Sequence, residues 1–459
     1  MADVARSELW DEDGRRVWTG PCGGHVEALS SATDRAAHST LRMLGGQNGS
    51  EKSCTSGDVV RLAEELEFIS REGCPPGFFN VLPAGTFLDL CVECFNRDHL
   101  EALGANRIDF PLVYDAGPAD IRALTRSYEA QGRVFKLEAH ERELRLAYAA
   151  DPGLFSWLRN KSLKPSLLPY AVYSPVSAFR RWQSGEVGGF AKMRQYTVPD
   201  LHILSGERDA WAVYQSAIKQ GAAGARFWFG EEWAQYVDVD ENFLENHSDV
   251  GAAFATAAQK LTLVNVLRRR PRYYAIKNGI MVGAGFTAMM LYNLQWDDTN
   301  AARFNISIDD SQELVIIHAT VAGGWPKLLP MFLGRGLTGT GPKIIPVECA
   351  ARQILILPID QSHLRAAELF SERLQSAGLR TAVDTSLRPL AQRLRQLRQK
   401  WQPFYCVIGD RESNGAEPLI QTYVGGAGQS AAEFLTTRGE RIRRCSPPAA
   451  RAPKPLPLA

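Results

Sequence analysis

The sequence predicts an α+β protein in which an antiparallel sheet with flanking helices is followed by a small α/β domain. Between residues 165 and 330, short apolar segments separated by turn residues favour strands and hairpins with inserted helices. Between residues 353 and 435, apolar segments alternate with amphipathic segments, which is typical of a largely parallel sheet packed against helices. A chain of 459 residues is long enough for two or three domains, each with its own core.

Four segments follow from composition and periodicity. Residues 1–57 are rich in glycine, serine, threonine and charged residues, so we expect a poorly ordered extension. Residues 58–342 form the larger core, and residues 346–440 form the small α/β domain. Residues 441–459 end in the proline-rich run PPAARAPKPLPLA, which predicts a disordered tail.

The elements that bear on function can be placed within these segments. Periodicity predicts a helix over residues 87–103, a strand over 107–114 and a helix over 250–267. Pro111 would need an edge or an interface, because proline cannot donate to a strand ladder. The basic run 268–270 could contact phosphate, or it could be the ordinary basic end of a helix. The small domain should contain strands over 353–359, 380–384 and 404–410, and helices over 363–378 and 390–401.

Charge and cysteine content limit the function classes. The composition, 45% hydrophobic and 22% charged, is that of an ordinary globular protein. A net charge of +1 gives no support for a large nucleic-acid footprint, although it is compatible with a small one. The eight cysteines lack the spacing of a disulfide framework, which favours a reducing, cytoplasmic compartment, and no apolar run is long enough to span a membrane. Cys91 and Cys94 are either two core thiols or a redox or metal pair.

Several motifs carry a family resemblance. Residues 104–111 resemble motif 1 of the class II aminoacyl-tRNA synthetases, and residues 179–202 (FRRWQSGEVGGFAKMRQYTVPDLH) resemble motif 2. Residues 318–327 (HATVAGGWPK) resemble motif 3. The ending D-x-H on Asp200 and His202 is similar to that of the threonyl branch, whose C-P-G-H falls on residues 151–154. The segment WQPFYCVIGDRE resembles the anticodon-binding signature of the threonyl, prolyl, histidyl and glycyl enzymes. The resemblance covers about residues 60–435, and residues 1–57 cannot replace the editing module of threonyl enzymes.

The resemblance implies a set of site residues. It implies ATP with Mg²⁺ as cofactor, a small amino acid as substrate and a homodimer. The expected catalytic residues are Arg180 and Lys327, and Asp200 and Arg303 are expected on the substrate side, with Asp200 pairing with the substrate ammonium. The expected ATP-binding residues are Arg180, Lys192, Arg194, Tyr196 and Lys327. The expected ligands of Zn²⁺, or of another divalent ion, are Asp151, His202 and His318.

The sequence also departs from the family pattern. Trp182 stands where the family has the acidic residue of motif 2. Lys327 stands where the family has the bidentate arginine of motif 3, and lysine offers a point charge in place of the two parallel hydrogen bonds of a guanidinium. Pro326 before it removes a helix N–H. We align the family's substrate-side Gln-x-Asp with Arg303 and Asn305. In the small domain the expected basic residues are replaced over 384–386 and 421–423, so tRNA contacts are depleted.

Three functions are therefore open. The first is a threonyl-tRNA synthetase-like paralogue that binds a small amino acid at a metal and activates it with ATP for a specialised biosynthetic acceptor. The second is a catalytically inactive binding or regulatory protein with the same scaffold. The third is a working threonine–tRNA ligase. The sequence names neither the amino acid nor the acceptor.

Overall fold

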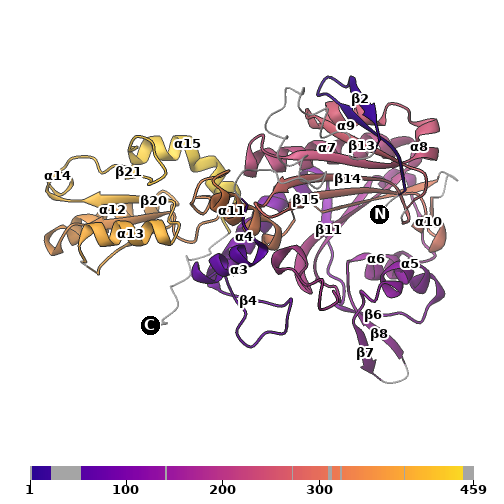
Figure 1. The fold of residues 1–459 in the computed structure, drawn as a ribbon, viewed down its shortest axis with the longest axis horizontal. Coiled ribbons are helices and arrows are strands. Elements are labelled where there is room, and N and C mark those ends of the chain that lie inside the picture. The colour runs from indigo at the N-terminus through magenta and orange to yellow at the C-terminus, as the bar shows by residue number, and fades with distance from the viewer. Residues whose placement is uncertain are drawn as a thin grey trace. The chain divides into compact units, whose positions relative to one another are not determined.

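The computed structural model describes residues 3–21, 53–139, 142–270, 272–308, 313–320, 323–386 and 388–447. The chain divides into two compact units, shown in Figure 1. The first contains residues 1–56, 75–78 and 96–331, and the second contains residues 57–74, 79–95 and 332–459. Most of the predicted tail, residues 448–459, lies outside the described residues, as do residues 22–52 of the predicted extension.

A ten-stranded sheet is the core of the first unit. Its strand order is β2-β1-β13-β12-β14-β15-β17-β11-β10-β5, antiparallel except for the β12–β13 and β10–β5 pairs. The strands are β1 Val4–Trp10, β2 Arg16–Gly20, β5 Ala105–Arg107, β10 Tyr170–Phe179, β11 Gln195–Gly206, β12 Ala234–Asp240, β13 Thr262–Leu267, β14 Tyr274–Gly283, β15 Ala288–Asp297 and β17 Leu314–Thr320. The predicted antiparallel sheet with inserted helices is confirmed.

Helices cover one face of this sheet. The long helix α7 (Glu207–Phe229) runs along β11, β14, β15 and β17, α8 (Glu241–Asn246) lies on β12, and α9 (Val250–Ala258) lies on β1 and β13 (Figure 1). Close contact requires glycine at Gly221 of α7, where a Cβ would lie 2.7 Å from the ring of Tyr292. The remaining elements of this unit are α5 Ala119–Ala130, α6 Asp151–Leu158, α10 Asn300–Arg303, and the short strands β6 Val113–Asp115, β7 Lys136–Ala139, β8 Arg142–Leu146, β9 Ser162–Leu163 and β16 Ser307–Ile308.

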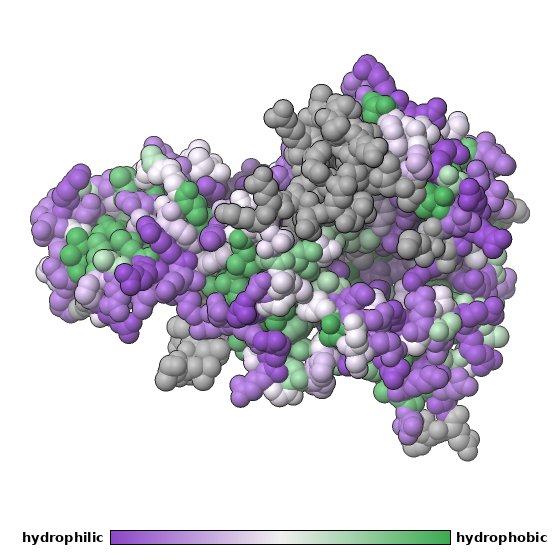
Figure 2. Space-filling model, viewed as in Figure 1, coloured by the Kyte–Doolittle hydropathy of each residue, from purple (hydrophilic) through white to green (hydrophobic). Residues whose placement is uncertain are grey.

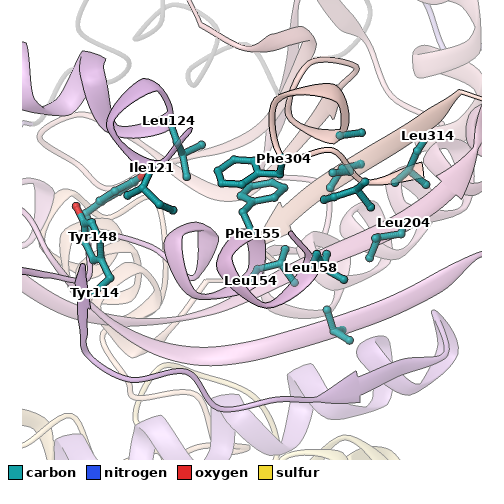
Figure 3. Close-up of a cluster of buried hydrophobic side chains, with 14 of the residues drawn as sticks. Tyr114, Ile121, Leu124, Tyr148, Leu154, Phe155, Leu158, Leu204, Phe304 and Leu314 are labelled. Carbon is teal, nitrogen blue, oxygen red and sulfur yellow. The ribbon is translucent and has the colours of Figure 1, made fainter. Parts of the chain in front are cut away.

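An apolar cluster holds α6 against the opposite face of the sheet (Figure 3). Leu154, Phe155 and Leu158 of α6 pack with Leu204 of β11. The rings of Phe155 and Phe304 stack with centroids 4.8 Å apart. Because burying one such side chain contributes about 1.5–3 kcal/mol, this cluster fixes the start of α6 relative to β11 and β17.

Residues 4–20 are ordered, so the expectation of a poorly ordered extension is wrong for them. β1 pairs with β13, and β2 pairs with β1. Ser7 and Glu8 of β1 are buried polar residues, which conceal the strand pattern in the sequence. Ser7 donates to Asn265 of β13 at 2.8 Å, and Glu8 accepts from the indole of Trp10, two residues further along β1, at 3.0 Å.

The Gly251→Val variant tests the docking of β1. A Cβ on Gly251 of α9 would lie 2.3 Å from the indole of Trp10, so the added side chain must displace that ring. We expect the free energy of unfolding to fall by about 1–3 kcal/mol in urea titrations. Gly185→Val is the matched control, because no atom lies within 4 Å of its ideal Cβ. Equal losses in the two variants would contradict the docking of β1 on α9.

Two sequence expectations about elements are wrong. Residues 250–267 form α9 and then β13, because Gln259 adopts a left-handed conformation that ends the helix. Arg270 therefore follows a strand and forms ion pairs with Asp240 and Asp298, which leaves little support for the phosphate alternative. The predicted strand 107–114 is divided between β5 and β6, and Pro111 lies in the connection between them.

The small α/β domain has the predicted order of elements. Its sheet has the order β19-β18-β20-β21, with β18 (Ile354–Pro358) parallel to both β19 (Thr381–Val383) and β20 (Phe404–Ile408). The helices are α12 Leu364–Ser376, α13 Leu390–Gln399, α14 Asp410–Ser413 and α15 Ala431–Arg444, and β21 is Ile420–Gln421. The other elements are α3 Ser56–Glu65, α4 Pro83–Ala102, α11 Trp325–Thr338, β3 Ile69–Ser70 and β4 Asn80–Val81. The predicted fold class is confirmed for both parts of the chain.

The visible surface is largely mixed in polarity, and two of the thiols are buried. Figure 2 shows polar and apolar residues interspersed over the visible face. Among the helices of the described residues, none combines the length and apolar character needed to cross a bilayer. Cys91 and Cys94 are buried in α4, and burial raises the pKa of the Cys91 thiol to about 12, which favours the interpretation as core thiols.

Candidate metal and substrate site

Two histidines and one carboxylate converge on the sheet face that α6 covers. His202 of β11 and His318 of β17 are direct cross-strand partners, and their ring centroids are 4.6 Å apart. Asp151 is the first residue of α6, and its Oδ1 lies 3.1 Å from Nδ1 of His318 and 3.5 Å from Nε2 of His202. One ligand atom from each of the three lies within 4.8 Å of the others, and all three residues are buried. The predicted metal ligands are therefore brought together.

The unsatisfied atoms of this group fit a divalent ion. Oδ1 of Asp151 and Nε2 of His202 are buried, and neither atom has a hydrogen-bond partner among the described residues. Leaving such atoms unsatisfied costs about 1–3 kcal/mol each. One cation bound between them would satisfy both, and imidazole with carboxylate is a donor set suited to Zn²⁺.

Asp297 orients His318, although none of the motifs recognised in the sequence includes this residue. Oδ2 of Asp297 lies 2.9 Å from Nε2 of His318, which leaves Nδ1 directed toward Asp151. Asp297 also accepts hydrogen bonds from the backbone N–H groups of Thr299 and Asn300 at 2.9 Å. Burial alone would lower the pKa of His318, but Asp151 and Asp297 raise it to about 10. A carboxylate behind a metal-binding histidine fixes its tautomer and raises its basicity.

The Asp297→Asn variant should weaken metal binding by about 10- to 100-fold. An amide does not supply the charge that fixes the proton on Nε2 of His318. The measurement is a competition titration with a chromogenic zinc chelator. Asp298→Asn is the matched control, because the next residue is exposed and pairs with Arg270. Equal zinc affinity in both variants would show that Asp297 does not support the group.

Asp200 connects the start of α6 to the sheet. Its Oδ2 accepts a hydrogen bond from the backbone N–H of Ala150 at 2.9 Å, directly before Asp151. Burial raises the pKa of the Asp200 carboxyl, with His202 opposing that effect. Asp200 lies two residues before His202 on β11, so both side chains lie on the same face of the sheet. Its expected pairing with a substrate ammonium stays a prediction.

A cationic group lies near the same sheet face. The guanidinium of Arg180 lies 5.6 Å from the ring of Tyr128 and 5.5 Å from that of Tyr196, and its Nε is buried without a partner. Burial would lower the pKa of Arg180, but Tyr196, Tyr128 and Asp200 raise it. Burial and the charge of Arg180 lower the pKa of Lys327 to about 8. Within the described part of the chain neither cation forms an ion pair, so both are available to an anion.

Comparison with known proteins gives one consistent family. The family described as Anticodon binding domain matches residues 353–417. Threonine–tRNA ligase of Methanothrix thermoacetophila is 24% identical over 371 residues, covering 77% of this chain and 58% of the relative. The Methanosarcina acetivorans enzyme is 25% identical over 380 residues, covering 77% and 57%. The chain is a class II threonyl-tRNA synthetase-like protein. This synthetase-like chain spans under two thirds of the length of these relatives.

Solved structures agree with the fold of the synthetase-like protein. A structure titled as the RNA binding domain of threonyl-tRNA synthetase from Cryptosporidium parvum has a TM-score of 0.67 at 17% identity, covering 85% of this chain and 99% of that chain. A threonyl-tRNA synthetase structure from Aeropyrum pernix has a TM-score of 0.69 at 15% identity, covering 87% and 99%. Prolyl-tRNA synthetase from C. parvum has a TM-score of 0.63 at 11% identity, covering 84% and 76%. At these identities the likeness concerns the fold.

A Gln-x-Asp sequence, formed by Gln295 and Asp297, lies beside His318, whereas Arg303 and Asn305 make their contacts elsewhere. Gln295 is the cross-strand partner of His318, and Asp297 contacts that histidine. Arg303 lies in α10 and donates to Asn300, and Asn305 donates to Asn160 at 3.0 Å. The local signal for these two residues is the sequence Gln-Trp-Asp at the end of β15, which lies outside the motifs recognised in the sequence.

Three motif 2 residues make contacts that the sequence did not predict. Nε and Nη2 of Arg194 donate to the carbonyl of Trp182 at 3.0 and 2.7 Å, and Nη1 donates to that of Pro76 at 3.2 Å. These bonds favour a structural role for Arg194. Two cations lie over the ring of Trp182: Cζ of Arg133 is 4.1 Å and Nζ of Lys192 is 5.2 Å from the ring centroid.

Two further findings concern the cationic group. Pro326 is the second residue of α11, where the missing N–H would have no helical partner, so the expected helix defect is absent. Arg272, which no sequence motif indicates, lies near Arg180: its Nη1 donates to the hydroxyl of Tyr128 at 2.7 Å, and its Cζ lies 4.7 Å from that ring. Residues 128 and 272 are far apart in sequence, and no local pattern connects them.

Proposed function

We propose that this chain binds a small amino acid at a divalent ion and activates it with ATP as an aminoacyl adenylate. One observation supports this most directly: the unsatisfied atoms of Asp151 and His202 face the Nδ1 of His318, which Asp297 orients. A bound divalent ion would supply electrostatic attraction for the amino and hydroxyl groups of the substrate. The relatives carry the name threonine–tRNA ligase, which favours threonine or a similar amino alcohol.

The chain's own residues have distinct proposed roles. Asp200 pairs with the ammonium, and Arg180 holds the substrate carboxylate beside the α-phosphate. A carboxylate oxygen then attacks the α-phosphorus and pyrophosphate leaves. Lys327 neutralises phosphate charge, and Tyr196 offers a flat face for adenine. Fixed charges of this kind act by positioning and electrostatic stabilisation.

The exchange rate should fall as pH rises through about 8, the lowered pKa of Lys327. Only the protonated ammonium attracts ATP phosphates, so its contribution is complete below that pH and disappears above it. In Lys327→Arg this loss should vanish, since guanidinium stays protonated. The measurement is ATP–pyrophosphate exchange between about pH 6.5 and about pH 9.5. Identical profiles for both proteins would exclude Lys327 from the ATP site.

Amino-acid-dependent ATP–pyrophosphate exchange tests the proposed function. The zinc-loaded protein is assayed with threonine, serine and a panel of small amino acids. Exchange with one of them supports activation. Zinc-dependent binding of an amino acid without exchange would favour the inactive binding protein. The departures from the family pattern at Trp182 and Lys327 are consistent with that alternative. Absence of both binding and exchange would refute the proposal.

A threonine–tRNA ligase is the second candidate function. The match of residues 353–417 to an anticodon-binding family favours it. Charging of total tRNA with threonine separates this function from activation for another acceptor.

We also propose a homodimer, because Leu112 and Val113 beside the motif 1 segment are 46% and 38% exposed. Light scattering of the purified protein measures its mass directly.

A further inference from the structure

A continuous row of polar side chains crosses the large sheet on the face that carries the metal group. Cross-strand pairing joins, in order from β1 to β11, Ser7, Asn265, Asp238, Lys277, Gln295, His318 and His202. Direct cross-strand partners project their side chains from the same face, with Cβ atoms about 4.5–5.5 Å apart. The row therefore leads from the metal group through β15, β14, β12 and β13 to β1.

The middle of this row is open, whereas both ends are closed. Ser7, His318 and His202 are buried, but the four residues between them are only partly buried: Asn265, Asp238, Lys277 and Gln295. Polar side chains on a sheet face need water, a protein partner or a ligand. The four middle residues can therefore meet a ligand that extends from the metal group.

Hydrogen bonds in the row converge on Asp238. The hydroxyl of Ser7 donates to Oδ1 of Asn265 at 2.8 Å, and Nδ2 of Asn265 donates to Oδ1 of Asp238 at 3.0 Å. The second oxygen, Oδ2, accepts no hydrogen bond from a residue that the structure describes. Asp238 is thus an oriented carboxylate with one open acceptor, and burial raises the pKa of its carboxyl.

The side of the row toward the metal group is positive. Lys277 follows Asp238 in the row, and it forms no ion pair within 4 Å with a described residue. Burial lowers the pKa of Lys277, Asp238 opposes that effect, and the charges of Arg272 and Arg180 add to it, so the three cations lie near one another. Such a group favours an anion such as the adenylate phosphate, whereas Asp238 beyond it favours a cation or a strong donor.

We propose that Asp238 and Asn265 form an acceptor subsite for a small primary amine, which receives the activated amino acid as an amide. This inference rests on the proposed function. The amine nitrogen attacks the carbonyl carbon of the aminoacyl adenylate, a C–N bond forms, and the C–O bond to the phosphate breaks. AMP leaves with the electron pair, and Asp238 takes the proton lost by the nitrogen. An RNA acceptor fits this subsite less well, because the carboxylate repels phosphate.

Product analysis tests the subsite. The zinc-loaded protein is incubated with ATP, threonine or serine, and one probe amine, either ethanolamine or β-alanine, and the amide is measured by mass spectrometry. Hydroxylamine, a small reactive trap, serves as the reference acceptor. The ratio of probe amide to hydroxamate should fall about 10- to 100-fold in Asp238→Asn, as expected for loss of a charged hydrogen-bond partner. Asp209→Asn is the control, because Asp209 is exposed on α7 against the opposite face.

Separate outcomes identify which proposal fails. An unchanged ratio in Asp238→Asn, or hydroxamate without any probe amide, would overturn the subsite while leaving activation intact. The same holds if tRNA is the acceptor and its charging is unaffected by Asp238→Asn. If no exchange occurs with any amino acid, binding of the probe amines is followed by saturation-transfer NMR. Binding that is lost in Asp238→Asn then supports the subsite, and equal signals in both proteins overturn it.

Discussion

Replacement of His202 by alanine is expected to remove the bound divalent ion and to reduce amino-acid-dependent exchange roughly 100-fold or more. His202 is buried, and its Nε2 has no hydrogen-bond partner among the described residues. Alanine leaves one imidazole and one carboxylate, which are too few ligands to hold zinc tightly. Metal content after dialysis, measured by mass spectrometry, gives a readout that does not depend on activity.

His247→Ala is the matched control for this change. His247 lies after α8 and stacks on Phe243, with ring centroids 4.0 Å apart, away from the metal group. We expect it to retain one metal ion per chain. Unchanged metal content in His202→Ala would contradict the ligand set and, with it, the metal-dependent part of the proposed function.

The second large effect is expected for Arg180→Ala, which should reduce the exchange rate about 10²- to 10³-fold. Arg180 lies between two tyrosine rings, and its buried Nε has no partner, so its guanidinium is held ready for an anion. Arg180→Lys should recover little activity, because lysine cannot form the paired hydrogen bonds of a guanidinium. The measurement is exchange at saturating amino acid with varied ATP.

Arg181→Ala provides the control in the next residue. Its backbone N–H bonds to the carbonyl of Arg133 at 2.9 Å, and its side chain is exposed. A truncation there should leave exchange near the level of the unchanged protein. Equal activity of the two alanine variants would remove Arg180 from the proposed mechanism, and metal content should stay normal in both.

Much of the fold could be predicted because its signals are local. In the small domain, apolar segments alternate with amphipathic ones, and β18, α12, β19, α13 and β20 appear where periodicity predicts them. The metal group could also be anticipated, because Asp151, His202 and His318 each lie within a motif that the resemblance covers. Local periodicity and short motifs survive without knowledge of the tertiary structure.

Other features had no local signal. β1 was missed because its buried polar residues Ser7 and Glu8 hide its alternation, and its pairing partner lies more than 250 residues away in β13. The role of Arg194 was not visible either, since the carbonyls it binds belong to Trp182 and Pro76. These contacts depend on which strands and loops become neighbours, and that is decided by packing of the whole sheet.

The sequence by itself determined the fold class and the order of elements in the small domain, because periodicity is a property of consecutive residues, and the family resemblance of its motifs implied the three ligand candidates. Only the tertiary structure decided that Asp297 orients His318, that Gln295 lies beside it and that a polar row continues to Asp238 and Ser7. Strand register sets these neighbours, and it is fixed by burial of one sheet face against α7 and α9.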